Sequence, residues 1–354
     1  MLNRLGMVLI RADATLELGS GHVMRCAALG MRLMARGALV HFVCVGLADG
    51  LADWLRGHSF GLTVLPAADI TDWCADLAAT CEVVRQVGHA DLLIVDHYGL
   101  ERAWESGMRP HTRRILVIDD LADRDHDCDL LLDQNLHEDA QSRYKQRVPH
   151  AALQFLGPQY ALLRFEFDEH GLERTRDGSV KRLLVFFGGT DLGNQTIKVI
   201  DALRALGSRA PESTIVLGPI YPYRDEIYKS VADLPSIHVL DTTDQMSMLI
   251  AQADLAIGTC GGGAWERCAL GLPCLVVVTA ENQREDAEIL HRLGAVEHLG
   301  DANEVTVENW ESALRRSMND PHRIRSMASA ARKVMVGRRT ALAELERTLV
   351  DGMH

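Results

Sequence analysis

The sequence has few features that would place it outside the globular enzymes. Its eight cysteines include no C-x-x-C pair, and several lie inside apolar runs, which favours free buried thiols in a reducing compartment over disulfides or a zinc site. No apolar run approaches the roughly 20 residues that a membrane-spanning helix needs, and the first residues lack a signal-peptide pattern. We therefore expect a cytoplasmic protein without a membrane segment.

The sequence also has fewer basic than acidic residues. Lys and Arg number 37 against 49 Asp and Glu, which gives a net charge of -12. This acidity argues against nucleic acid as a partner, because nucleic-acid-binding proteins present a basic field. A small anionic ligand is not excluded, since a single site can be positive on an acidic protein. The 354 residues suggest two domains, each large enough to bury its own core.

Short apolar runs recur along the chain and alternate with segments long enough for helices. Runs of about four to eight large or β-branched apolar residues are typical of strands buried on both faces. The alternation predicts an α/β fold with a parallel sheet and covering helices in each half, that is, two Rossmann-like domains. The predicted strands are residues 7–10, 39–45, 62–65, 92–95, 115–118, 130–132, 183–187, 214–217, 238–240, 255–257 and 275–278.

A polar, charged and glycine-containing segment, residues 168–182, separates the two halves and has no apolar periodicity. We take it as the linker between an N-terminal domain of residues 1–170 and a C-terminal domain of residues 171–354. The final segment, residues 321–350, has the pattern of two helices that could pack back across the domain interface.

Ligands of open parallel sheets bind beyond the carboxyl ends of the strands, so the polar residues after each run are candidate site residues. In the first half, several runs end in acids or amides. Capping of the next helix or turn would explain any one of them, whereas their repetition at equivalent positions favours a cleft. The groups are Asp96, His97 and Tyr98; Asp119 and Asp120; and Asp133, Gln134 and Asn135.

The first candidate motif places Gly19, Gly21 and His22 between a predicted strand and a helix that starts near His22. Glycines at such a turn let a ligand approach the backbone closely. Met24 occupies the position where the dinucleotide-binding pattern G-x-G-x-x-G needs glycine, so that pattern is excluded. His22 is a candidate catalytic residue, although a structural hydrogen-bonding role fits the spacing as well.

Gly188, Gly189 and Thr190 follow the first predicted strand of the second half. Glycines between a strand and a helix expose backbone N–H groups, and a helix N-terminus attracts phosphate. A tight strand-to-helix turn would also explain these residues.

The most specific signal is a run of three glycines that opens a later helix. The amides of Gly261, Gly262 and Gly263 can wrap a diphosphate without steric hindrance. Glu266 lies about one turn into the helix, where its carboxylate can accept hydrogen bonds from both ribose hydroxyls.

These motifs carry a family resemblance. The glycine run with Glu266 in a helix ending G-L-P resembles the UDP-sugar site of GT-B glycosyltransferases. The motifs G-S-G-H-x-x-R, I-V-D-H-Y-G, Y-A-L-L-R-x-E-F and F-F-G-G-T-D occur in order between residues 11 and 273. Together they resemble the UDP-sugar hydrolases of pseudaminic acid biosynthesis, which cleave UDP-2,4-diacetamido-2,4,6-trideoxy-β-L-altropyranose. The resemblance implies a GT-B-like fold, with two Rossmann-like domains facing a cleft.

The resemblance also implies roles for individual residues. His22 matches the family's catalytic base, and Tyr98 matches a tyrosine that assists near the sugar. Arg164 matches a substrate-binding arginine and Glu266 the nucleotide-binding glutamate. The other expected substrate-binding residues are Asp13, Gly21, Asn135, Gly189, Thr190, Gly261, Gly262 and Gly263.

The expected chemistry needs one base. UDP is a good leaving group, so a neutral imidazole that activates water suffices, and no metal or cofactor is expected. Water held by His22 on the face opposite UDP would invert the anomeric carbon. Two alternatives stay open: a GT-B glycosyltransferase with a UDP-N-acetylhexosamine donor, and a non-catalytic UDP-sugar-binding protein. The family resemblance favours a monomer.

Overall fold

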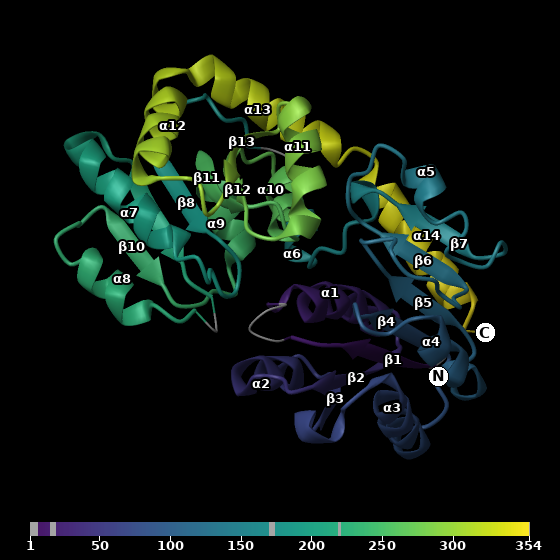
Figure 1. The fold of residues 1–354 in the computed structure, drawn as a ribbon. Helices are drawn as coiled ribbons and strands as arrows, with labels where there is room; N and C mark the ends of the chain where they lie inside the picture. The colour runs from purple at the N-terminus through teal and green to yellow at the C-terminus, as the bar shows by residue number, and fades with distance from the viewer. Residues whose placement is uncertain (1–5, 15–18, 170–173, 219–220, 354) are drawn as a thin grey trace. The chain divides into compact units, whose positions relative to one another are not determined.

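A computed structural model describes residues 6–14, 19–169, 174–218 and 221–353 and divides the chain into two compact units (Figure 1). The first unit combines Met1–Phe165 with Gly337–His354, and the second is Glu166–Val336. Each unit contains one parallel sheet with helices, so the predicted α/β class with two Rossmann-like domains is confirmed. Within the described ranges, no helix has the length and apolarity needed to cross a membrane.

The sheet of the first unit has seven parallel strands in the order β3-β2-β1-β4-β5-β6-β7. The direction of winding reverses between β1 and β4, which makes this pair the topological switch point. The strands are β1 (Met7–Ala12), β2 (Leu39–Val45), β3 (Gly61–Leu65), β4 (Leu92–Asp96), β5 (Ile115–Ile118), β6 (Leu130–Asp133) and β7 (Leu153–Leu156). The helices are α1 (Gly21–Ala35), α2 (Asp49–Gly57), α3 (Trp73–Val87), α4 (Arg102–Met108), α5 (Ala140–Arg143) and α14 (Arg338–Asp351).

Alternate side chains of β1 enter two separate cores. Val8 and Ile10 pack in the core that also contains α1, α2 and α14, whereas Leu9 packs with α3 and α4. All three side chains are fully buried. A strand covered on both faces must be apolar throughout, which is why the strands of this sheet are recognisable as continuous apolar runs.

Helix α14 completes the core of the first unit. One face of the helix packs in the same cluster as Val8 and Ile10, through Leu342, Leu345 and Leu349. Its Glu346 accepts hydrogen bonds from Arg32 at 3.2 Å and from Arg36 at 2.6 Å. The prediction of two C-terminal helices is therefore confirmed, but the expected domain of residues 171–354 differs from the structure, because the apolar face of α14 is buried in the first unit.

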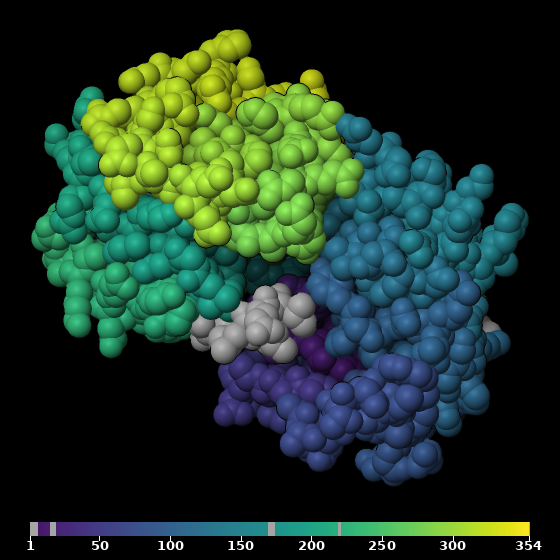
Figure 2. Space-filling model, viewed as in Figure 1, coloured from purple at the N-terminus to yellow at the C-terminus, as the bar shows by residue number. Residues whose placement is uncertain are grey.

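The second unit has a six-stranded parallel sheet in the order β10-β9-β8-β11-β12-β13, with its switch point between β8 and β11. Its strands are β8 (Arg182–Phe186), β9 (Glu212–Val216), β10 (Ile237–Leu240), β11 (Leu255–Thr259), β12 (Cys274–Val278) and β13 (Val296–Asp301). Its helices are α6 (Glu166–Glu169), α7 (Gln195–Leu206), α8 (Arg224–Ser230), α9 (Met246–Gln252), α10 (Gly263–Ala269), α11 (Arg284–Arg292), α12 (Val307–Asn319) and α13 (Pro321–Val334). In Figure 2 the side chains of α11, α12 and α13, in yellow-green, form a broad surface of this unit.

Residues 174–178, expected to be part of a linker, are anchored to the second unit. Arg176 is buried, and its guanidinium donates to four backbone carbonyl groups, those of Ile250, Ala253, Leu270 and Gly271. These carbonyls lie at the ends of α9 and α10, so the cation caps both helices. Burial, together with the nearby charges of Arg174 and Arg332, lowers the pKa of Arg176 to about 10.

Candidate active site

The candidate catalytic residues lie at the switch point of the first unit. The chain leaves β1 and passes through Gly19, whose φ is +69°, into α1, of which His22 is the second residue. Strand β4 ends at Asp96, two residues before Tyr98. The carboxyl ends of neighbouring parallel strands lie at one edge of the sheet, and there the rings of His22 and Tyr98 meet edge to face, with centroids 4.8 Å apart.

His22 is fixed by a buried carboxylate. Its Nδ1 lies 2.5 Å from Oδ1 of Asp96, which also accepts from Nη2 of Arg25 at 2.7 Å. Burial raises the pKa of Asp96, but the charges of Arg25 and His22 outweigh burial and hold this pKa far below its usual range. The ionised carboxylate can only accept hydrogen bonds. In the neutral imidazole the proton is therefore on Nδ1, and the lone pair is on Nε2.

The second ring nitrogen of His22 is the one available for chemistry. Within the described ranges its hydrogen-bonding contacts with protein side chains all involve Nδ1. The side chain is 9% exposed, so part of the ring reaches the surface. An imidazole that is oriented through one nitrogen and open at the other has the arrangement of a general base.

Tyr98 is held by a second carboxylate. Its hydroxyl donates to Oδ1 of Asp120 at 3.0 Å, and Oδ2 of Asp120 accepts from Nη1 of Arg25 at 3.0 Å. Burial and the Asp120 carboxylate raise the pKa of Tyr98 well above its usual value. The phenol therefore stays neutral at physiological pH. Its one hydrogen is donated to Asp120, so its oxygen can only accept a further hydrogen bond.

Asp13 follows β1 and is tied into the loops around it. Its carboxylate accepts from the guanidinium of Arg11, from the backbone N–H of Val45 at 2.7 Å and from Nε2 of His97 at 3.1 Å. Burial raises the pKa of Asp13, but the hydrogen bonds from His97 and Arg11 bring it below its usual range. These contacts join the carboxyl ends of β1, β2 and β4, so Asp13 supports the loops, and its contact with substrate stays a prediction.

The other expected residues of the first unit lie further along the chain. Gly21 is the exposed first residue of α1, and nothing lies within 4 Å of the position that a Cβ would take. Asn135 follows β6, and its backbone N–H donates to Oδ1 of Asp133 at 3.0 Å. Arg164 is half-buried, in a segment that Arg32 holds by donating to the carbonyl of Leu163 at 3.0 Å.

The second unit has its two glycine turns at its own switch point. Residues 188–190 follow β8, and residues 261–263 follow β11, with Gly263 as the first residue of α10. The first turn is packed against Gly218 at the end of β9, whose φ is +98°. A Cβ on Gly218 would lie 2.8 Å from the carbonyl oxygen of Gly189, so this close approach of two backbones requires glycine.

The turn after β8 also has a structural cap. Asp191, directly after Thr190, has a φ of +41° and accepts from the backbone N–H groups of Gln195 and Thr196, both at 2.9 Å. This carboxylate occupies donors at the start of α7. The turn is therefore a capped strand-to-helix turn at the switch point, and phosphate binding by its backbone stays a prediction.

Glu266 lies beside the second glycine turn. It is half-buried in α10, and its Oε2 is 3.9 Å from the position of a Cβ on Gly263. Arg267 is buried and donates to the carbonyl of Thr259, which fixes the start of the turn. On the other side, Nε2 of Gln283 lies 3.6 Å from the position of a Cβ on Gly261. Gln283 was not among the predicted site residues, although its place after β12 at the same sheet edge could have indicated it.

The partners of His22 were also missed. Asp96 was noted as an acid after a strand, but its pairing with His22 joins residues 74 apart. Arg25, one turn after His22, bonds to Asp96 and to Asp120 across 71 and 95 residues. Spacing along the chain carries no information on such contacts, which become visible once β4 is placed beside β1 and β5 beside β4.

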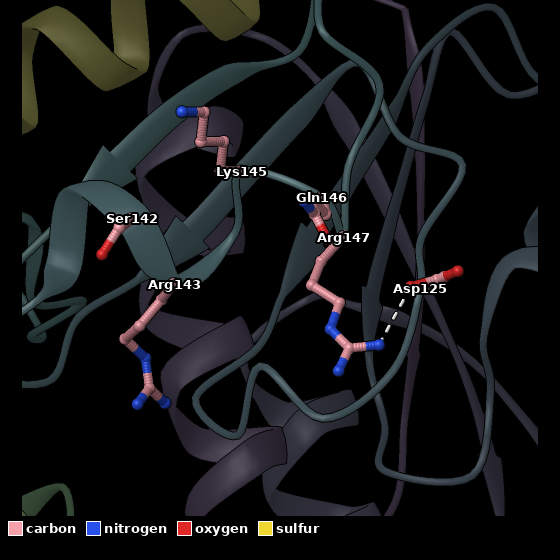
Figure 3. A pocket seen from close by; sticks show the side chains of 6 residues that line it. All are labelled: Asp125, Ser142, Arg143, Lys145, Gln146 and Arg147. Carbon is pink, nitrogen blue, oxygen red and sulfur yellow. Dashed lines mark hydrogen bonds and ion pairs between the residues drawn. The ribbon is translucent and has the colours of Figure 1, made fainter.

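A separate hollow of about 480 Å³ on the first unit contains no predicted site residue (Figure 3). Its cationic side chains do not converge. Arg147 donates to Asp125 at 3.1 Å, while Arg143 and Lys145 extend away from one another. In the part of the chain that the structure describes, no group of His, Cys, Asp and Glu side chains is arranged to hold a metal ion.

Comparisons with known proteins add to this geometry. Residues 183–342 match the glycosyltransferase family 28 C-terminal domain, a range that contains both glycine turns. An uncharacterised protein of Methanocaldococcus jannaschii is 25% identical over 287 residues, which cover 78% of this chain and 57% of that protein. A UDP-2,4-diacetamido-2,4,6-trideoxy-β-L-altropyranose hydrolase of Campylobacter jejuni is 28% identical over 197 residues, covering 55% of this chain and 65% of that protein. The chain thus spans less than two thirds of the length of these curated relatives.

Solved structures share the fold over nearly the whole chain. Acinetobacter baumannii MurG has a TM-score of 0.64 and 13% identity, covering 97% of this chain and 99% of that chain. The spinosyn rhamnosyltransferase SpnG with spinosyn aglycone has a TM-score of 0.66 and 18% identity, with the same coverage. Together with the two parallel sheets, these likenesses confirm the predicted GT-B fold.

Proposed function

We propose that the protein is a UDP-sugar hydrolase that releases UDP from UDP-2,4-diacetamido-2,4,6-trideoxy-β-L-altropyranose by attack of water on the anomeric carbon. The observation that carries the proposal is the His22–Asp96 pair, 2.5 Å apart at the switch point of the first unit. The similarity to the Campylobacter jejuni hydrolase supports this choice of sugar. The match to the family 28 C-terminal domain supports a nucleotide-sugar substrate.

In this reaction His22 acts as the general base. Its Nε2 takes a proton from water while the water oxygen forms a bond to the anomeric carbon, and the bond from that carbon to the UDP oxygen breaks. The imidazolium that forms is stabilised through Nδ1–H by the ionised Asp96. Attack from the face opposite UDP inverts the anomeric configuration.

The remaining candidate residues bind rather than react. Tyr98, neutral and edge-on to His22, would accept a hydrogen bond near the sugar through its oxygen, because its one hydrogen is donated to Asp120. In the second unit, Glu266 would accept from the ribose hydroxyls. The backbone N–H groups of the adjacent glycine turn would stabilise the charge that develops on the leaving diphosphate.

Turnover in oxygen-18 water tests which bond breaks. We expect the label in the free sugar. NMR spectra taken before mutarotation should show inverted configuration at the anomeric carbon, and activity should survive EDTA. Label in the phosphate of the released nucleotide, or a strict requirement for a divalent metal, would contradict the proposed mechanism.

A GT-B glycosyltransferase is the second candidate, favoured by the family 28 C-terminal match. It would release UDP from a UDP-N-acetylhexosamine only when an acceptor hydroxyl is present, whereas the hydrolase releases UDP in water alone. A non-catalytic UDP-sugar-binding protein would bind UDP and release none under either condition. Assays of UDP release with and without acceptor therefore separate all three functions.

A further inference from the structure

Arg25 joins the two carboxylates that hold His22 and Tyr98. It lies one turn after His22 in α1, and its side chain is only 12% exposed. Its Nε and Nη2 donate to Asp96 at 2.6 and 2.7 Å, and its Nη1 donates to Asp120 at 3.0 Å. A planar guanidinium with several donors can hold two carboxylates in fixed directions at once, which a single ammonium group cannot do.

The charges around His22 pull its protonation in opposite directions. A carboxylate beside an imidazole favours the imidazolium, whereas a general base must be neutral before it can accept a proton. Asp96 on its own would therefore orient His22 and at the same time favour its charged form. Nη2 of Arg25 lies 3.3 Å from Nδ1 of His22. Since Nδ1 already bears a hydrogen directed at Asp96, this contact is electrostatic, and the cation opposes the imidazolium.

Among the described residues, the other groups near His22 do not replace the positive charge of Arg25. From α1, the buried thiol of Cys26 donates to Asp96 at 3.4 Å. From the loop after β4, Tyr98 presents a neutral phenol, and Asp120 after β5 adds a second negative charge. Arg124 lies 5.7 Å from the ring of Tyr98, but it is paired with Asp119 at 2.7 Å.

We propose that Arg25 is a positioning residue that keeps His22 in its neutral, proton-accepting form while Asp96 fixes the orientation of the ring. This inference rests on the proposed function and deepens it, because it assigns the protonation of the base to a residue that does not itself react. Arg25 then has two roles: its positive charge opposes protonation of His22, and its side chain bridges Asp96 and Asp120.

Three variants separate these roles. Arg25→Gln keeps hydrogen-bond donors but removes the charge, and Arg25→Lys keeps the charge but cannot bridge both acids. The matched control is Arg36→Met, which removes a charged partner of Glu346 at the far end of the same helix. The imidazole of His22 is titrated by NMR in the substrate-free full chain, with His22→Asn to assign its signal. The dependence of kcat on pH is then measured for each variant.

In Arg25→Gln we expect the imidazolium of His22 to persist to a pH higher by at least about one unit, the size of effect that a neighbouring charge has. In the dependence of kcat on pH, the acidic limb also moves to higher pH. Arg25→Lys keeps the wild-type titration but lowers kcat at its plateau, and Arg36→Met changes neither. If Arg25→Gln fails to fold by circular dichroism, Arg25→Met provides the neutral side chain.

A titration of Arg25→Gln or Arg25→Met that coincides with wild type would overturn the inference, whatever happens to turnover. If the wild-type protein releases no UDP from any UDP-sugar, the proposed function fails. The NMR titration still decides the role of Arg25 in that case, because it needs no substrate.

Discussion

The rings of His22 and Tyr98 stand perpendicular, with an interplanar angle of 90°. Each ring is hydrogen-bonded to a different carboxylate, His22 to Asp96 and Tyr98 to Asp120. Both carboxylates accept hydrogen bonds from Arg25. The two candidate catalytic side chains therefore belong to one hydrogen-bonded network, although one lies in α1 and the other in the loop after β4. A change in any member is expected to disturb the other members as well.

Replacing the proposed base should slow turnover without weakening nucleotide binding. His22→Asn should lose at least about 100-fold in kcat, the lower end expected for a general base, while the affinity for UDP barely changes. His58→Asn is the control, since His58 is exposed on the same unit. Near wild-type turnover of His22→Asn would remove His22 from the mechanism.

Asp96→Asn keeps the shape of the side chain but removes its charge. The amide can donate to His22 as well as accept from it, so the tautomer with the lone pair on Nε2 is no longer enforced. We expect kcat to fall on the order of 10²–10⁴-fold with little change in KM. Equal losses in kcat and in UDP affinity would point instead to a general loss of structure, which thermal unfolding would reveal.

The proposed nucleotide site of the second unit can be tested with UDP alone. Glu266→Ala should weaken UDP binding by roughly 1.5–3 kcal/mol, the range for hydrogen bonds to a charged group. Glu311→Ala, which removes an acid paired with Arg315 on α12, should leave binding unchanged. Calorimetry with equal affinities for wild type and Glu266→Ala would place the ribose contact elsewhere.

His126 makes stability depend on pH. It is buried, with Nδ1 2.7 Å from Oε1 of Glu105 and Nε2 3.8 Å from Oδ2 of Asp119. Burial lowers the pKa of His126, but the two carboxylates outweigh burial and raise it to about 9. A raised pKa in the folded state stabilises the protein fully below the unfolded value of 6.5.

This stabilisation is lost as the pH rises from 6.5 through about 9. It amounts to about 3 kcal/mol at most, and urea unfolding at a series of pH values measures it. His126→Gln should be less stable at pH 6 and should lose less stability than wild type on the way to alkaline pH. Parallel curves for the two proteins would contradict the prediction.

The fold could be predicted where the sequence carries the physical cause of the structure. A strand buried on both faces must be apolar, so β2 and β5 have the bounds that their apolar runs indicate. Strands β7 and β13 were missed, because Leu153 and Gln154 are exposed at an edge of the sheet and because β13 contains Glu297, His298 and Gly300.

The candidate site could be predicted only in part. Local motifs indicated His22, Tyr98 and the glycine turns, since the residues that form a turn are neighbours in the sequence. The bonds to Asp96 depend on which strand lies beside β1, and that order is set by packing of the whole sheet. In the same way, the polar appearance of residues 174–178 concealed Arg176, whose partners are backbone carbonyls and have no signature in the sequence.

Helix α14 makes the first unit discontinuous along the chain, which leaves it at Glu166 and returns to it at Gly337. During translation the ribosome makes the whole second unit before α14 exists. Until then, the apolar surface that Leu342, Leu345 and Leu349 cover on the first unit stays open to water. The first unit can therefore complete its core only after α14 has been made, and a nascent chain stalled before residue 337 presents an incomplete core to chaperones and proteases.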